Sequence, residues 1–100
     1  MMNNTCTQHK TVPVQFTKKG FHYQCLRRQG DAAIYIQTRP GSGMCNYEVI
    51  KIGRHNGYTM GGVYIAPSET YPGASLWGLC GWTCATLEDA NARFNTIAMA

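Results

Sequence analysis

The chain has 100 residues, of which 44% are hydrophobic and 14% are charged, and its net charge is +4. This length suits a single domain, and the low charge together with 11% aromatic residues argues against intrinsic disorder. No apolar run reaches the length of a membrane span, and the polar first ten residues lack the apolar core of a secretory signal. The sequence therefore predicts a cytoplasmic protein with no membrane partner.

The charge balance leaves the class of partner open. Nine Lys and Arg residues stand against five Asp and Glu residues. A basic excess favours an acidic partner such as nucleic acid, but it also serves to keep a small protein soluble.

The first half of the chain alternates in the way that antiparallel strands do. We expect a flexible leader over residues 1–11 and a single domain over residues 12–100. Residues 12–16 predict a short edge strand, because Pro13 cannot donate a hydrogen bond to a sheet. Residues 21–27 and 32–37 then predict a hairpin. The residues expected on one face of its first strand are Phe21, Tyr23 and Cys25.

The second half is less regular. Residues 45–52 predict a third strand and residues 53–57 a turn. Residues 58–65 predict a fourth strand, in which a Gly-Gly pair indicates a bulge or a close backbone approach. Residues 66–85 are interrupted by Pro and Gly and contain both tryptophans. We expect an irregular segment that folds over the sheet or forms a recognition surface.

The C-terminus predicts one helix. Thr86 is a good N-cap, and Asp89 follows it by three residues. One face of the helix is apolar and is expected to pack on the sheet: Leu87, Ala90, Phe94 and Ile97. Together the elements predict an α+β fold, an antiparallel sheet of four or five strands with one C-terminal helix packed on one face.

The five cysteines do not predict a disulfide framework. Their odd number prevents complete pairing within one chain, and a free Cys in the cytosol behaves as a small hydrophobe. Cys6, His9, Cys80 and Cys84 form a conceivable zinc set, but both spacings are irregular for zinc. We expect no metal and no cofactor, and metal binding or reactivity at Cys6, Cys80 and Cys84 stays an open alternative.

No catalytic constellation stands out. Asp31 falls in a turn, while Glu88 and Asp89 fall at a helix start where negative charge is favoured. Of the two remaining carboxylates, Glu48 and Glu69, we expect Glu48 on the solvent face of its strand. No nucleophile elbow, cysteine-protease signature or phosphate loop is present. We expect no enzymatic activity, and a small cysteine- or metal-dependent enzyme is the catalytic alternative.

Nucleic-acid binding is a second alternative. Tyrosines on strands inside a basic rim are how proteins stack and hold single-stranded nucleic acid. The basic residues assigned to this alternative are Arg27, Arg28, Arg39, Lys51 and Arg54. No RRM, KH or double-stranded RNA-binding signature accompanies them.

The tryptophan-containing loop is the candidate surface for binding a protein. Trp, Tyr and Arg dominate the energetics of protein interfaces. The predicted partner-binding residues are Tyr71, Trp77, Trp82 and Arg54.

The same loop carries a resemblance. Residues 71–83 read Tyr-Pro-Gly-Ala-Ser-Leu-Trp-Gly-Leu-Cys-Gly-Trp-Thr. This segment resembles a loop of small proteins carried by bacteriophages and other mobile elements, in which Tyr-Pro and a small residue precede Trp-Gly, two residues and Gly-Trp. Outside the loop, the matching residues are Ala33-Ile34-Tyr35, Tyr47-Glu48-Val49, Ala90 and Phe94. Cys80 and Cys84 are not part of the pattern.

The resemblance transfers no activity and no catalytic residue. It implies a class of function, because phage accessory proteins of this size often bind a host component. Antagonists of bacterial defence, including anti-CRISPR proteins, are one such class. We therefore expect a small phage or prophage accessory protein that binds and inhibits a host protein, such as a CRISPR effector, and that is a monomer or a homodimer.

Overall fold

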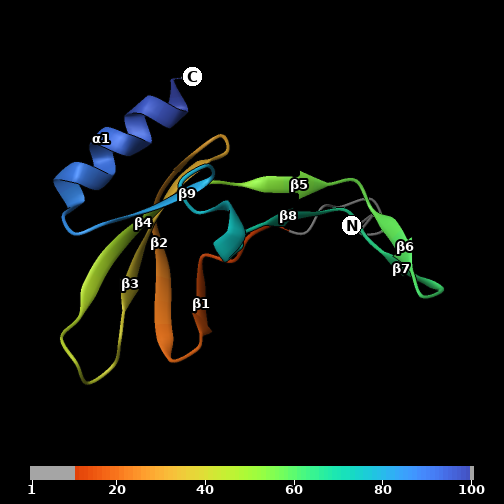
Figure 1. Ribbon diagram of the computed structural model, residues 1–100, viewed down its shortest axis with the longest axis horizontal. Coiled ribbons are helices and arrows are strands. Elements are labelled where there is room, and N and C mark those ends of the chain that lie inside the picture. The colour runs from red at the N-terminus through yellow and green to blue at the C-terminus, as the bar shows by residue number, and fades with distance from the viewer. Residues whose placement is uncertain (1–10, 100) are drawn as a thin grey trace, which may run out of the picture.

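The computed structural model describes residues 11–99 of the chain, which form a sheet, a helix on one face of it and a long arm (Figure 1). The sheet is antiparallel and has five strands in the order β1-β2-β3-β4-β9. Its strands are β1 (Gln15–Lys18), β2 (Phe21–Gln29), β3 (Ala32–Thr38), β4 (Cys45–Lys51) and β9 (Gly81–Cys84). The other elements are β5 (Gly53–His55), β6 (Tyr58–Met60), β7 (Val63–Ile65), β8 (Ser68–Thr70), the short 3₁₀-helix η2 (Ala74–Leu76) and α1 (Leu87–Ala98). The predicted α+β fold is confirmed.

The N-terminal part of the described chain differs from its predicted strand. The leader expected over residues 1–11 lies, apart from Thr11, outside the described residues. The first strand begins at Gln15, three residues later than predicted, although the Cys25 amide still donates to the Val14 carbonyl at 2.7 Å. The two residues before Val14 bond to side chains. The backbone amide of Val12 donates to the Glu69 carboxylate at 3.2 Å, and the Tyr35 hydroxyl donates to the Pro13 carbonyl at 2.7 Å.

The hairpin of β2 and β3 is confirmed, with one irregularity. The register shifts between Cys25 and Arg27, so that Leu26 is an extra residue in β2. Such a bulge changes the face to which the following residues point. Tyr23 and Cys25 pack in one core cluster as the alternation predicts, whereas Arg27 lies opposite Ile34 on the other face.

Residues 53–70 form an arm that projects from the sheet (Figure 1). The root of the arm is β5 paired with β8, and its tip is β6 paired with β7. The predicted turn over residues 53–57 and the predicted single strand over residues 58–65 are therefore wrong. Gly61 and Gly62 have φ values of 60° and 81°, which reverse the chain in a two-residue turn where we expected a bulge or close approach.

The predicted irregular segment over residues 66–85 also contains strands. It supplies β8 to the arm and β9 to the edge of the sheet, where β9 pairs with β4. Such short strands carry little pattern of their own, and their pairing depends on the strand edges that β4 and β5 offer.

The helix prediction is confirmed at its start and corrected at one position. The Thr86 hydroxyl accepts a hydrogen bond from the Asp89 amide at 3.1 Å, which is the expected N-cap. Ala90 and Phe94 are fully buried and Ile97 packs beside them. Leu87 is 43% exposed, so the packed face of the helix begins one turn later than predicted.

Two core clusters lie on opposite faces of the sheet. We call the face covered by α1 the helix face and the other the open face. The helix-face cluster consists of Ala32, Ile34, Val49, Ala90 and Phe94. The open-face cluster consists of Val12, Tyr23, Ala33, Tyr35, Ile50 and Ile52.

Candidate functional site

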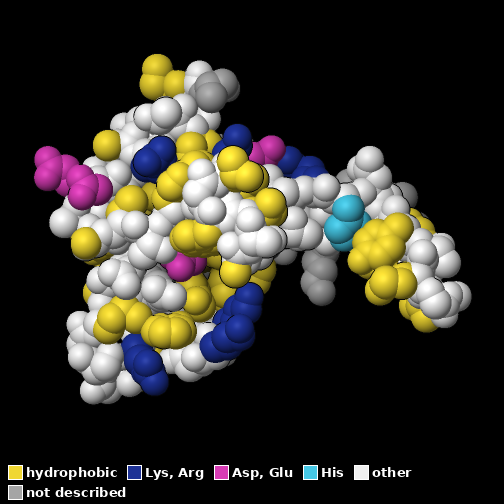
Figure 2. All heavy atoms as spheres, in the orientation of Figure 1, with side chains coloured by type: hydrophobic (Ala, Val, Ile, Leu, Met, Phe, Trp, Pro, Cys, Tyr) yellow, Lys and Arg dark blue, Asp and Glu magenta, His cyan; other side chains and the backbone are white. Residues whose placement is uncertain are grey.

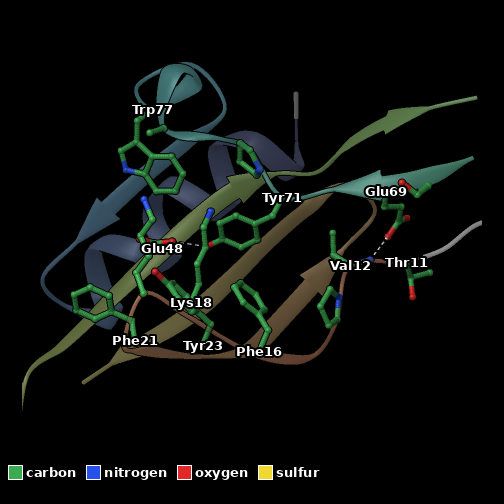
Figure 3. A pocket seen from close by; sticks show the side chains of 15 residues that line it. Thr11, Val12, Phe16, Lys18, Phe21, Tyr23, Glu48, Glu69, Tyr71 and Trp77 are labelled. Carbon is green, nitrogen blue, oxygen red and sulfur yellow. Dashed lines mark hydrogen bonds between the residues drawn. The ribbon is translucent and has the colours of Figure 1, made fainter. Parts of the chain in front are cut away.

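The open face is hollowed into a pocket of about 810 Å³, which we call the aromatic pocket (Figure 3). Its walls come from β1, β2, β4 and β8, together with residues 11–13 and the segment from Tyr71 to Trp77, which contains η2. The aromatic lining residues are Phe16, Phe21, Tyr23, Tyr71 and Trp77, and the charged ones are Lys18, Lys19, Glu48 and Glu69. This size and composition are typical of a binding site.

The aromatic rings support one another. Phe16 stacks on Tyr23 with ring centroids 4.6 Å apart, and the Tyr71 ring meets Phe16 edge-on at 5.4 Å. Tyr71 also meets Tyr35 edge-on at 5.2 Å and lies 6.5 Å from Trp77. Each such pair adds about 0.5–1.5 kcal/mol beyond burial of its area. The wall of the pocket is therefore largely formed before any ligand enters.

The side chain of Trp77 is held in place by contacts with β9. A Cβ atom on Gly81 would come 2.4 Å from the Trp77 ring, so only glycine lets the indole rest on this backbone. The indole N–H donates to the Thr83 hydroxyl at 3.0 Å, and the Gly78 amide donates to the Gly81 carbonyl at 2.7 Å. The segment that was predicted to be irregular thus holds the Trp77 side chain in one position.

Glu48 lies at the centre of the pocket and is 8% exposed, which corrects the expectation that it faces solvent. It comes from β4 opposite Tyr35, and its carboxylate accepts a hydrogen bond from the Tyr71 hydroxyl (Figure 3). Burial raises the pKa of Glu48, while the hydrogen bond from Tyr71 and the positive charge of Lys18 oppose that rise. Burial, followed by the Glu48 carboxylate, also raises the pKa of the Tyr71 hydroxyl.

A cluster of ion pairs joins the arm to the sheet. The Glu69 side chain is 7% exposed and accepts two hydrogen bonds from Arg28, at 2.7 and 2.8 Å. Arg54 reaches the same carboxylate at 3.1 Å and Asp31 at 2.5 Å. The hydrogen bonds from Arg28, with help from the Val12 amide, lower the pKa of Glu69 to about 2. The root of the arm is therefore tied to β2 by charge-assisted bonds.

The structure divides the predicted partner-binding residues among three places. Tyr71 and Trp77 meet in the aromatic pocket. Trp82 is opposite Val49 on the helix face, where Arg93 lies over its ring at 4.8 Å. Arg54 belongs to the ion-pair cluster at the root of the arm.

Sequence reasoning missed the rest of the aromatic pocket. The alternation of residues 21–27 correctly predicted that Phe21 and Tyr23 share one face of β2. Nothing in the sequence indicates that Phe16, Glu48 and Tyr71 would share that face, because they come from segments far apart in the chain.

The five basic residues assigned to nucleic-acid binding do not form one surface. Arg27 turns toward the helix, where it donates to Asn91 at 2.9 Å and lies over the Phe94 ring at 4.0 Å. Arg28 and Arg54 are both paired with Glu69. Arg39 lies over Phe21, at the opposite end of β2 from Arg28, and Lys51 is exposed at the end of β4. The arrangement offers no continuous basic track.

The described residues contain no cluster of side chains that is arranged to bind a metal ion. Cys6 and His9 of the conceivable zinc set lie outside them. Within residues 11–99, no three His, Cys, Asp or Glu side chains are grouped so as to hold a metal ion. Cys80 and Cys84 are free thiols, and burial raises the pKa of Cys84.

Comparisons of the chain with protein-family models, with curated proteins and with solved structures found no significant match. Across the described residues, no helix combines the length and apolar character needed to span a membrane.

Proposed function

We propose that this chain is a protein-binding module, a small phage or prophage accessory protein that inhibits a host protein in the bacterial cytoplasm. The observation that carries the proposal is the aromatic pocket, an apolar cavity of about 810 Å³ whose walls include Tyr71 and Trp77. The resemblance of residues 71–83 to phage proteins supports the source, and a defence component such as a CRISPR effector is one class of target.

The pocket also defines the chemistry of the partner. Its rings offer a rigid aromatic surface to an aliphatic or aromatic side chain, and buried anchors of this kind supply most of the energy of a protein interface. Lys18 and Lys19 line the same pocket and are exposed. They favour a partner segment that has a carboxylate next to its apolar anchor.

The inhibition that we propose is steric. A domain that accepts a partner's anchor in its pocket covers the partner's surface around that anchor. Such an interface typically buries about 800 Å² on each side. The partner loses access to that surface for as long as the complex lasts.

The test is a pull-down from bacterial lysate in which two tryptophan variants are compared with the unmodified chain. Trp77→Ala removes a wall of the pocket, and Trp82→Ala removes the same side chain from the opposite face. Circular dichroism and urea unfolding establish that both variants are folded. We expect a nuclease-resistant host protein that is retained by the unmodified chain and by Trp82→Ala and is lost with Trp77→Ala.

Calorimetry with the purified host protein then measures the affinity directly. Loss of a hot-spot tryptophan weakens binding by about tenfold or more. Equal affinity of the Trp77→Ala variant and the unmodified chain would overturn the assignment of the pocket. Recovery of nucleic acid, with protein partners lost after nuclease treatment, would support the nucleic-acid alternative instead.

A further inference from the structure

The centre of the aromatic pocket holds a carboxylate that the described chain leaves largely unpaired. Glu48 is 8% exposed and points from β4 into the pocket, among the rings that line it (Figure 3). Within residues 11–99 its carboxylate accepts one hydrogen bond, from the Tyr71 hydroxyl, and takes part in no ion pair. A carboxylate can accept about four hydrogen bonds, and a buried one is unfavourable unless it is paired. Glu48 therefore has acceptor capacity left for a ligand.

A second carboxylate of the same pocket shows the kind of group that would pair with Glu48. Glu69 also lines the pocket, and its side chain is 7% exposed. It accepts two hydrogen bonds from the guanidinium group of Arg28, at 2.7 and 2.8 Å, and one from Arg54 at 3.1 Å. Two equally buried carboxylates thus differ in one respect, because guanidinium groups of the chain pair with Glu69 and none pairs with Glu48.

The ring faces near Glu48 also lack a cation. The face of an aromatic ring carries partial negative charge and attracts a guanidinium group. Three arginines of the chain lie over aromatic rings, at 4.0–5.4 Å from the ring centre, and one of those rings is Phe21 at the edge of the pocket. Within residues 11–99, no Lys or Arg lies over the rings of Phe16, Tyr71 or Trp77. The pocket therefore offers a cation both a carboxylate and free ring faces.

Two lysines restrict which cation can enter. Lys18 and Lys19 line the pocket and are exposed, so they repel a cation that arrives alone. Figure 2 shows acidic atoms recessed between hydrophobic side chains, with a group of Lys or Arg side chains nearby at the surface. A ligand that matches this pattern has a cationic end for the recess and an anion for the rim. An arginine with an Asp or Glu close to it in the same segment has both.

We propose that the aromatic pocket takes an arginine side chain of the partner, with its guanidinium group on the Glu48 carboxylate and an adjacent carboxylate of the partner at Lys18 and Lys19. The aliphatic stem of arginine is long enough to lie along the rings while the charged group reaches the recess. Arginine fits better than lysine, because its planar group places two N–H donors on one carboxylate, stacks on rings and is more weakly hydrated. This inference rests on the proposed function, since it specifies the anchor of the host protein.

The first test titrates the unmodified chain with short capped peptides and follows the indole N–H signals by NMR. The chain has two tryptophans, so Trp77 in the pocket is read against Trp82 on the opposite face, and Trp82→Phe assigns the two signals. We expect acetyl-Gly-Arg-Asp-Gly-amide to shift the Trp77 signal to saturation and to leave the Trp82 signal in place. A peptide with citrulline, which keeps the shape of arginine without its charge, should bind about tenfold more weakly or less. A peptide with lysine should also bind more weakly than the arginine peptide.

The second test changes the carboxylate. Glu48→Gln removes the charge and keeps an oxygen that can accept from the Tyr71 hydroxyl. It should weaken binding of the arginine peptide by about tenfold or more and reduce the preference for arginine over citrulline. Glu88→Gln removes an exposed carboxylate from α1, which covers the other face of the sheet, and should leave binding unchanged. Circular dichroism establishes that both variants are folded.

Several results would overturn the arginine anchor. They are a Trp77 signal that does not respond to the arginine peptide, equal binding of the lysine or citrulline peptide, and equal binding of the arginine peptide by Glu48→Gln and the unmodified chain. A shift with guanosine monophosphate in place of the arginine peptide would assign the pocket to a nucleotide instead.

Failure of this inference is distinguishable from failure of the proposed function. A host protein that is retained by Glu48→Gln and lost with Trp77→Ala would support the protein-binding pocket and overturn the arginine anchor. Selective binding of the arginine peptide, without any host protein captured through Trp77, would support the arginine site and contradict the inhibition of a host protein.

Discussion

The two faces of the sheet are built from alternate residues of the same strands, yet only one of them is closed. The helix face packs small and aliphatic side chains such as Ala32, Ile34 and Val49 against Ala90 and Phe94 of α1. A helix can approach a sheet closely where such residues meet, and the side chains then pack densely. That face is a structural core.

The α-helix α1 does not cover the open face, which is lined by aromatic rings instead. Tyr23 and Tyr35 from the strands meet Phe16 and Tyr71 from neighbouring segments, and Glu48 is buried among them. Rings that are braced by loops leave a hollow between them, which is the aromatic pocket. The comparison teaches that the α-helix on one face forms a packed core, whereas the loop segments on the other face leave a pocket open.

Deleting the main contact of the closed face should have the largest effect. Phe94 is fully buried, and Phe94→Ala is expected to lower the free energy of unfolding by about 3–5 kcal/mol, because it leaves a cavity in the core. Leu87→Ala, at an exposed position on the same helix, should cost less than about 1 kcal/mol. Urea unfolding measures both, and equal losses would contradict the assignment of Phe94 to the core of the helix face.

Removing the charge that anchors the arm beside the open face should have an intermediate effect. Glu69→Gln is expected to cost about 2–3 kcal/mol at neutral pH, because Arg28 loses its carboxylate partner. The folded-state pKa of Glu69 is lowered from 4.5 to about 2, so its contribution is present above pH 4.5 and is lost as the pH falls toward 2.

Stability measured as a function of pH checks this prediction. The unmodified chain should lose stability between pH 4.5 and about 2, and Glu69→Gln should show a smaller slope across that window. Glu88→Gln removes an exposed carboxylate from the first turn of α1 and should cost less than about 1 kcal/mol at neutral pH. An unchanged slope in Glu69→Gln would show that the ion pair does not stabilise the root of the arm.

Displacing one wall of the aromatic pocket should have the smallest effect on stability. In Gly81→Ala the new methyl group would lie 2.4 Å from the Trp77 ring, so the indole must move, at a cost of about 1–2 kcal/mol. Fluorescence of Trp77, read in a Trp82→Phe background, should shift as the ring becomes more exposed. Gly73→Ala is the control, since its methyl group meets no atom within 4 Å. Identical spectra for the two variants would mean that Gly81 does not position the tryptophan.

Local patterns were enough to predict much of the fold. Alternation of apolar and polar residues identified β2, β3 and β4, and the Thr86 cap identified the start of α1. These features depend on residues that are close together in the chain, so the sequence contains the information directly.

The arm shows where local reasoning failed. Gly61 and Gly62 are compatible with a bulge in one strand and with a turn between two strands. Their positive φ values show that they form the turn. Residues 58–65 are therefore a hairpin and not a single strand. The two alternatives differ in which segments pair, and pairing depends on residues distant in sequence.

The sequence by itself determined the α+β class, the strands at the centre of the sheet, the capped helix and the presence of a tryptophan-rich loop. Only the tertiary structure brought Tyr71 and Trp77 together with Phe16 and Glu48, and placed Trp82 on the opposite face. The physical reason is that secondary structure depends mainly on neighbours along the chain. A pocket depends on which strands pair and on which faces of the elements pack together. The pairing and the packing are determined by the whole domain, and no single segment encodes them.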